Sequence, residues 1–164
     1  MKLLEKLPSI IDKDLQIRNE YIKAQSWASI IVLGPFRVIE AYWLSQAVSL
    51  NESSDRATNL ICFNEGVETK ITTIGSSYRE ILDSVSVSYI DPLIITDNDF
   101  SYLAYFSMYG DFYMICGGSE FLSVAYPLPF SVVEADFFDE AKFKSERDHI
   151  NVSYYKKLWK RYNV

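Results

Sequence analysis

The sequence contains little of the chemistry that most enzymes and metal proteins use. Among its 164 residues are one histidine, His149, and two cysteines, Cys62 and Cys116. His149 lies in a charged stretch, where a histidine is usually a solvated surface residue and not a general base. The cysteines lie far apart in apolar runs, and two are too few for a disulfide framework, so we expect reduced core thiols.

Motifs for cofactors and catalysis are also absent. The chain has no CxxC or HExxH spacing for a metal, no GxGxxG or P-loop for a nucleotide and no GxSxG for a nucleophile. Asp97-Asn98-Asp99 begins like a calcium-binding loop but lacks its glycine and its final glutamate, so we interpret it as a turn. We therefore expect no metal, no cofactor and no enzymatic activity.

Long apolar runs are missing as well. The run 28–36 is short, and the run 121–133 contains Pro127 and Pro129. Neither approaches the roughly 20 residues that span a bilayer. The N-terminus lacks the apolar stretch of a secretory signal, so we expect a cytoplasmic protein. A net charge of −6 disfavours nucleic acids and anionic membranes as partners, because both are themselves negative.

What the chain does contain is typical of a globular domain. Apolar residues make up 49% and charged residues 23%, without a repeat or a flexible linker, so we expect residues 1–164 to form a single domain. Periodicity predicts helices over 15–27, 37–50, 132–148 and 154–162, and a further helix that Ser77 caps and that stops before Asp91-Pro92. Strands are predicted over 60–63, 67–74 and 93–96, with turn residues at 64–66 and an exposed loop at 51–55.

The predicted strands 100–108, 112–116 and 121–126 form a C-terminal meander, with turns at 109–111 and 117–120. The order of elements predicts an α+β fold with an antiparallel or mixed sheet and helices packed on one face. In helix 37–50 the spacing predicts a buried face, made of Val38, Ile39, Tyr42, Trp43, Ala47 and Leu50. In the tail, an apolar stripe is expected to dock on the domain, made of Tyr155, Leu158, Trp159 and Tyr162.

Charge is distributed unevenly along the chain. Residues 80–141 contain no lysine or arginine, whereas the last 23 residues carry seven bases and two acids. The same 62 residues hold eleven acids: Glu80, Asp83, Asp91, Asp97, Asp99, Asp111, Glu120, Glu134, Asp136, Asp139 and Glu140. Such an imbalance creates a negative field that attracts a basic partner.

Aromatic residues are interleaved with these acids, namely Phe100, Tyr102, Tyr105, Tyr109 and Tyr113. Aromatic anchors inside a polar rim are typical of protein-binding surfaces, although strand alternation requires half of the rings to face the core. We predict a partner-binding surface made of Asp91, Asp97, Asp99, Phe100, Tyr102, Asp111, Glu120, Glu134, Asp136 and Asp139.

The segment from Gly110 to Phe121, GDFYMICGGSEF, has the form GDF-apolar-GG-x-EF. Together with the small, acidic α+β character of the chain, it resembles the immunity proteins of bacterial polymorphic toxin systems, including contact-dependent growth inhibition. The resemblance covers this segment and the overall character of the chain. It implies a cognate toxin domain, often a basic nuclease, that is blocked in the cytosol by a tight complex.

Two alternatives remain open at this point. The chain could be a structural or adaptor protein that uses its basic tail, Lys156, Lys157, Lys160 and Arg161, as a contact. It could also be an enzyme or a small-ligand binder, because acid and base groups can meet from distant positions in a deep pocket.

Overall fold

The computed structural model describes residues 2–51, 57–63, 69–88 and 90–163. The N-terminal elements are α1 (Lys2–Ile10), α2 (Asn19–Ala24), β1 (Ala28–Leu33), α3 (Val38–Asn51), β2 (Thr58–Cys62), β3 (Lys70–Ile74) and α4 (Tyr78–Val87). The C-terminal elements are β4 (Leu93–Asp97), β5 (Tyr102–Phe106), the short helix η1 (Met108–Gly110), β6 (Phe112–Gly117), α5 (Ser119–Ala125), α6 (Phe130–Asp148) and α7 (Val152–Tyr162).

Within the described residues, six strands form one sheet in the order β1-β6-β5-β4-β2-β3, and every neighbouring pair is antiparallel. The predicted α+β fold is confirmed. Strands β4, β5 and β6 follow one another as a meander, and β1 pairs with the outer side of β6. The pairing register aligns one row of side chains across all six strands: Ile31, Met114, Tyr105, Ile94, Ile61 and Ile71.

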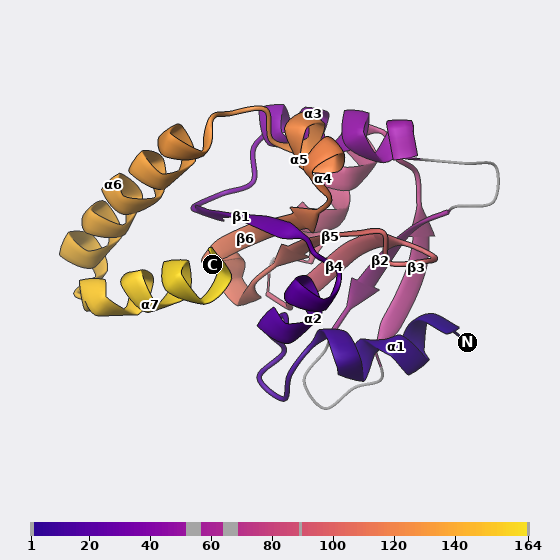
Figure 1. The fold of residues 1–164 in the computed structure, drawn as a ribbon, viewed down its shortest axis with the longest axis horizontal. Helices are drawn as coiled ribbons and strands as arrows, with labels where there is room; N and C mark the ends of the chain where they lie inside the picture. The colour runs from indigo at the N-terminus through magenta and orange to yellow at the C-terminus, as the bar shows by residue number, and fades with distance from the viewer. Residues whose placement is uncertain (1, 52–56, 64–68, 89, 164) are drawn as a thin grey trace.

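Helices cover both faces of the sheet (Figure 1). On one face the Tyr105 hydroxyl donates to the carbonyl of Leu15 at 3.0 Å, so the N-terminal segment lies over the row of six. On the other face the ring of Tyr102 stacks on Phe121 of α5, with centroids 4.6 Å apart. The expectation of helices on one face was therefore wrong. All residues of β4, β5 and β6 are buried, because elements packed on both faces of the sheet exclude solvent from these strands.

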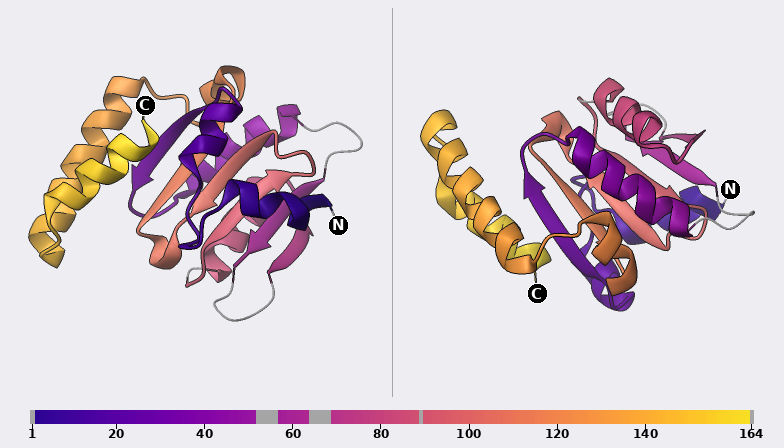
Figure 2. Two further views of the ribbon diagram at one scale, coloured as in Figure 1. Left: turned by 60° about the horizontal axis from the view of Figure 1, so that its bottom comes forward. Right: turned by 90° about the horizontal axis from the view of Figure 1, so that it is seen from above.

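Helices α6 and α7 form a pair beside β1, at the edge of the sheet (Figure 2). The ring of Trp159 in α7 contacts Phe137 of α6, with centroids 4.7 Å apart. The predicted apolar stripe of the tail is buried in full, at Tyr155, Leu158, Trp159 and Tyr162. Docking of the tail as a structural helix is thus confirmed.

Two predicted elements were wrong, each for its own physical reason. Leu15 and Ser26 both have positive φ, so the predicted helix 15–27 shortens to α2. Asp12 accepts hydrogen bonds from the N–H groups of Asp14 and Gln16 in the turn that precedes α2. The predicted strand 121–126 is helix α5, for which Gly118 is the N-cap and Glu120 lies in the first turn. Acidic residues in a first turn favour a helix, and β1 occupies the sheet position that a third meander strand would have taken.

Helix α3 has the predicted position but a different buried face. Val38, Ile39 and Tyr42 are 45–57% exposed, and Leu50 is also exposed. The residues that α3 does bury are Glu40, Ala41, Leu44, Ser45, Ala47 and Val48. Apolar residues occur all round this helix, and α4 and α5 both pack against it, so the spacing could not select a face.

Other local predictions are confirmed. Ser77 is the N-cap of α4 and accepts a hydrogen bond from the Glu80 N–H at 3.3 Å, and β2 pairs with β3 as a hairpin. The turn predicted at 64–66 lies outside the described residues, as does the predicted loop except for Asn51, which ends α3. In the part of the chain that the structure describes, no single helix has the length and apolar composition to cross a bilayer. Helices α5 and α6 meet that test only as a pair, and they are bent by 58°.

Candidate binding groove along α6

The turn between β1 and α3 lies between two cavities that follow α6. Gly34 in this turn has a φ of 101°, a conformation that favours glycine, and its N–H donates to the Asp111 carbonyl at 3.4 Å. A Cβ on Gly34 would lie 4.0 Å from Oε1 of Glu140, so α6 comes close to the turn. Pro35 lines both cavities, which therefore adjoin.

The first cavity has a volume of about 480 Å³ and lies between β1 and α6. Asp136, Asp139 and Glu140 line it from α6, and Arg37 and Tyr126 also line it. Asp136 and Glu140 are four residues apart, so helical geometry places them on the same side of α6. The cavity is thus acidic along its helical wall.

Arg37 is neutralised by a carboxylate beneath it. The Glu40 side chain is completely buried and accepts hydrogen bonds from the Arg37 backbone N–H at 3.1 Å and from its Nε at 2.8 Å. Nη2 of Arg37 forms an ion pair with the same carboxylate. The hydrogen bond to Glu40 raises the pKa of Arg37. Arg37 therefore offsets Glu40 and adds little positive field to the cavity.

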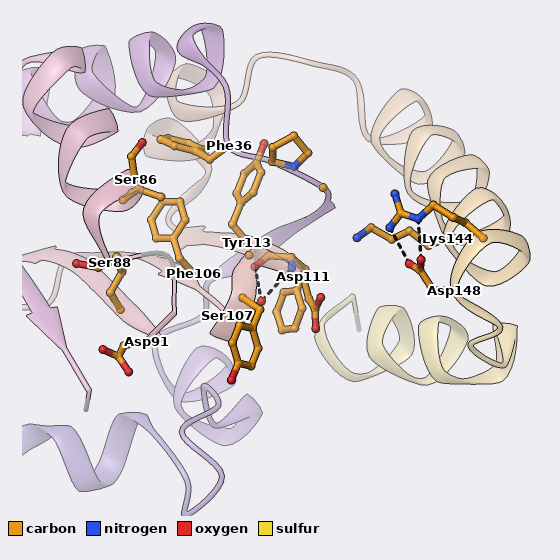
Figure 3. Close-up of a pocket in the computed structure, with 18 residues that line it drawn as sticks. Phe36, Ser86, Ser88, Asp91, Phe106, Ser107, Asp111, Tyr113, Lys144 and Asp148 are labelled. Atoms are coloured by element: carbon orange, nitrogen blue, oxygen red, sulfur yellow. Dashed lines mark hydrogen bonds and ion pairs between the residues drawn. The ribbon is translucent and has the colours of Figure 1, made fainter. Parts of the chain in front are cut away.

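The second cavity has a volume of about 500 Å³ and lies between the β5–β6 turn and the C-terminal half of α6 (Figure 3). Its aromatic base is the ring of Phe36, which packs edge-on against Phe106 and Tyr113 with centroids 4.9 Å and 5.2 Å away. Burial raises the pKa of Tyr113, so this hydroxyl stays neutral. Asp91 and Asp111 line the cavity from the sheet side.

Lys144, Arg147 and Asp148 line the second cavity from α6. Two nitrogens of Arg147 each donate to an oxygen of Asp148 at 2.7 Å, and this pairing lowers the pKa of Asp148. The pair cancels its own charge, and Lys144 has no ion-pair partner among the described residues. Lys144 is thus the one lining cation there whose charge is not offset.

We call the two adjoining cavities the α6 groove. Five carboxylates that line it form no ion pair with any residue that the structure describes: Asp91, Asp111, Asp136, Asp139 and Glu140. The positive charge of Lys144 is the one lining cation charge that is not offset within an ion pair among the described residues. The negative field predicted for residues 80–141 is therefore concentrated in a concave surface, where low-dielectric walls strengthen it.

The structure brings together four of the ten predicted site residues, namely Asp91, Asp111, Asp136 and Asp139. Glu134 is exposed on α6 but lines neither cavity. Glu120 lines a different cavity beside Leu50 and Phe121. Asp99 is exposed in the β4–β5 turn, at the opposite end of β4 from Asp91.

Three predicted site residues are buried and belong to the core. Asp97 is 4% exposed, and its carboxylate accepts hydrogen bonds from the N–H groups of Asp99 at 3.1 Å and Ser101 at 2.8 Å. This carboxylate organises the β4–β5 turn, as a side chain in an Asx-turn does. Phe100 and Tyr102 are 2% and 1% exposed. The prediction that Asp97, Phe100 and Tyr102 belong to a partner-binding surface was wrong, because all three side chains are buried.

Glu140 and Tyr109 line the groove but were not among the ten predicted site residues. Glu140 follows Asp136 by one helical turn, and that spacing could have indicated it. Tyr109 is the only one of the five interleaved aromatics that is exposed, and it lines the second cavity. The predicted turn at 109–111 was the local signal for its exposure, because the other four aromatics lie in strands or, in the case of Phe100, are buried in the β4–β5 turn.

Among the described residues, no group of three or more histidine, cysteine, aspartate or glutamate side chains is arranged to hold a metal ion. No protein-family model matches the chain, and it has no significant match among curated proteins or solved structures.

Proposed function

We propose that this protein is a non-catalytic inhibitor that binds a basic protein domain in the α6 groove. The observation that carries the proposal is the set of five carboxylates without an ion-pair partner among the described residues, gathered in one concave surface. Unpaired like charges repel one another, and a basic partner would relieve that repulsion while the field speeds its encounter. The aromatic base of the second cavity supplies the apolar contact that such interfaces need.

The resemblance to bacterial immunity proteins suggests which partner this is. An immunity protein neutralises a cognate toxin domain, and a nuclease domain is basic because it binds phosphate. The proposal places the protein in the cytoplasm, where such a toxin would act. Inhibition would follow from occlusion of the toxin, so it would require one copy of the inhibitor for each copy of the toxin.

Co-expression tests this function directly. The reading frame next to the gene is expressed alone and then together with this protein. The proposal expects growth arrest in the first case and normal growth in the second, with a stable complex of the two proteins in size-exclusion chromatography. Rescue of growth without a complex would contradict binding as the mechanism.

A titration separates an inhibitor from an enzyme. The partner's activity is measured while this protein is added in increasing amounts. The proposal expects a linear loss of activity that ends at equimolar protein, because each complex blocks one partner. Complete loss at a small fraction of equimolar protein would indicate catalytic turnover and would overturn the proposal.

A further inference from the structure

Tyr109, in the turn between β5 and β6, has an unusual backbone. Its φ is 58° and its ψ is 15°, in the left-handed region. A residue with a Cβ adopts this region at a cost in free energy, because the Cβ crowds the neighbouring carbonyl. The side chain of Tyr109 is nevertheless 57% exposed, so burial of the ring does not offset that cost.

The other described non-glycine residues with positive φ are Leu15, Ser26, Phe100 and His149, and none of them exposes a large aromatic ring of the Phe, Tyr or Trp type. Phe100 has a φ of 57°, but its ring is 2% exposed and packs in the core. Leu15 packs against the core, and His149 is the C-cap of α6, where a left-handed residue is common. Ser26 is small and polar. Tyr109 is the third residue of a turn closed from Ser107 to Gly110, a position that can take a left-handed residue, and its large ring is exposed.

The turn holds Tyr109 in a fixed position on the groove. The Ser107 hydroxyl donates to the Phe112 carbonyl at 2.8 Å and accepts from the Phe112 N–H at 2.9 Å (Figure 3). The Gly110 N–H donates to the Ser107 carbonyl at 3.1 Å. These bonds close the turn that carries Tyr109, and the exposed residue Asp111 lines the same cavity.

We infer that Tyr109 and Asp111 together form the anchor point for an arginine side chain of the protein partner. The inference rests on the proposed function and names one specific contact in the groove. A guanidinium is planar, so it can lie on the exposed face of the Tyr109 ring while its N–H groups donate to Asp111.

A short peptide serves as the probe. The capped tripeptide Gly-Arg-Gly is titrated into the full chain, and amide and ring signals are followed by NMR. The same tripeptide with citrulline in place of arginine has the same shape without the charge. The inference expects saturable shifts at Tyr109 and Asp111 with arginine and little change with citrulline. Equal shifts with both peptides, or shifts elsewhere only, would overturn it.

Two tyrosine variants isolate the role of the ring. Tyr109→Asn keeps a residue that tolerates the left-handed region, so its melting temperature should equal or exceed that of the parent protein. Its affinity for the arginine peptide should fall about two- to fivefold, the factor that an exposed cation–π contact contributes. Tyr42→Ala is the control, because Tyr42 is 48% exposed and lines neither cavity. Unchanged affinity in Tyr109→Asn would overturn the inference.

The outcomes separate this inference from the function it rests on. If the protein neutralises its partner and Tyr109→Asn binds that partner with the parent's affinity, the anchor is wrong and the function stands. If the arginine peptide binds at Tyr109 while the protein neutralises no partner, the function is wrong and the anchor site stands.

Discussion

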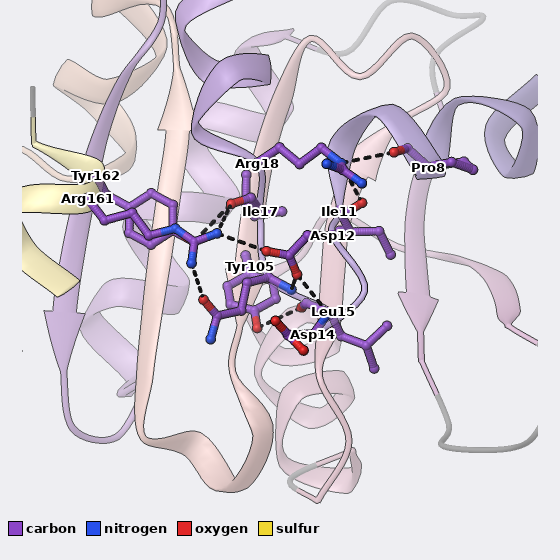
Figure 4. A network of polar contacts seen from close by, with 11 residues as sticks. Pro8, Ile11, Asp12, Asp14, Leu15, Ile17, Arg18, Tyr105, Arg161 and Tyr162 are labelled. Carbon is purple, nitrogen blue, oxygen red and sulfur yellow. Dashed lines mark hydrogen bonds and ion pairs between the residues drawn. The ribbon is translucent and has the colours of Figure 1, made fainter. Parts of the chain in front are cut away.

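The guanidinium of Arg161, near the end of α7, forms an ion pair with the carboxylate of Asp12 at 3.0 Å (Figure 4). The same guanidinium donates to Oε1 of Gln16 at 2.7 Å, and the neighbouring Tyr162 hydroxyl donates to the carbonyl of Ile17 at 2.9 Å. The last helix is thus tied to the segment between α1 and α2. This contact joins segments from near the two ends of the chain.

The Asp12 contact makes stability depend on acid pH. Burial alone would raise the pKa of Asp12, but hydrogen bonds from Gln16 and Arg161 outweigh it and hold the pKa below its usual value. A carboxyl with a lowered folded pKa contributes stability above its unfolded pKa of about 3.9, and that contribution is lost as pH falls through the folded pKa. Asp12→Asn should lower the free energy of unfolding by about 1 kcal/mol at pH 7. The variant should also lose less of its free energy of unfolding than the parent protein when the pH is lowered from neutral to acid.

Urea unfolding followed by circular dichroism at neutral and acid pH measures this effect. The control is Asp14→Asn, whose exposed side chain makes no described hydrogen bond. The account is contradicted if the two variants show the same stability at both pH values.

Trp159 should be the residue of α7 that contributes most to stability. Its side chain is 8% exposed, and its ring contacts three rings of α6, namely Phe130, Phe137 and Phe138. Trp159→Ala should lower the free energy of unfolding by about 3 kcal/mol, because it leaves a cavity between the helices. Lys157→Ala, at an exposed position of the same helix, should change it little. Equal melting temperatures of the two variants would show that α7 is not docked in solution.

The Arg37–Glu40 pair should behave as a coupled unit. Arg37→Ala leaves the buried Glu40 carboxylate without its partner and should cost about 2 kcal/mol, less than in a fully buried pair because the guanidinium is 67% exposed. The double variant Arg37→Ala, Glu40→Leu removes the buried charge as well and should recover at least part of that loss. The coupling is the stability loss of the double variant minus the sum of the losses of the two single variants, each measured by thermal unfolding. A coupling of zero would contradict the prediction.

The two cysteines should differ in reactivity. Cys116 is completely buried, and burial raises the pKa of its thiol, so it should resist alkylation in the folded protein. Cys62 is half-buried and should react faster. Mass spectrometry after iodoacetamide treatment at mildly alkaline pH measures both rates, with urea-unfolded protein as the reference in which the rates converge. Cys116→Ala should cost about 1 kcal/mol and leave partner binding intact. Faster labelling of Cys116 than of Cys62 in folded protein would rule out this burial pattern.

Local sequence signals predicted local structure well. Ser77 with Glu80, the proline after Asp91 and the apolar spacing of the tail each identified an element that the structure contains, because the interactions that specify them lie within a few residues. Strand β1 had no such signal. Its apolar run could form a helix or a strand equally well, and only pairing with β6, whose partner residues lie 79 to 89 positions later, decides the outcome.

The candidate site was predicted only in part, because its overall charge is visible in the sequence whereas the direction of each side chain depends on long-range pairing. The absence of lysine and arginine over residues 80–141 indicated an acidic surface, and four of the predicted acids do line the groove. The sequence could not show that Asp97 turns inward to hold the β4–β5 turn while Asp111 faces out. That distinction depends on the hydrogen bonds of each turn, which form only when the strands pair.

The central claim is that the charge of the α6 groove drives binding of a basic partner. Its most direct test is the association rate constant with that partner, measured by stopped-flow fluorescence at about 0.05 M and about 0.5 M NaCl. The Debye length is about 10 Å at about 0.1 M, so it is longer than this at the low salt concentration and shorter at the high one. The matched variants are Asp136→Lys with Asp139→Lys, in the groove, and Glu134→Lys, on the same helix outside it. We predict that the association rate of the parent protein falls by about tenfold or more between the low and the high salt concentration. The double variant should associate slowly at both concentrations. Glu134→Lys should keep most of the parent's rate and salt dependence. Equal rates for the parent and the double variant at low salt would contradict the account.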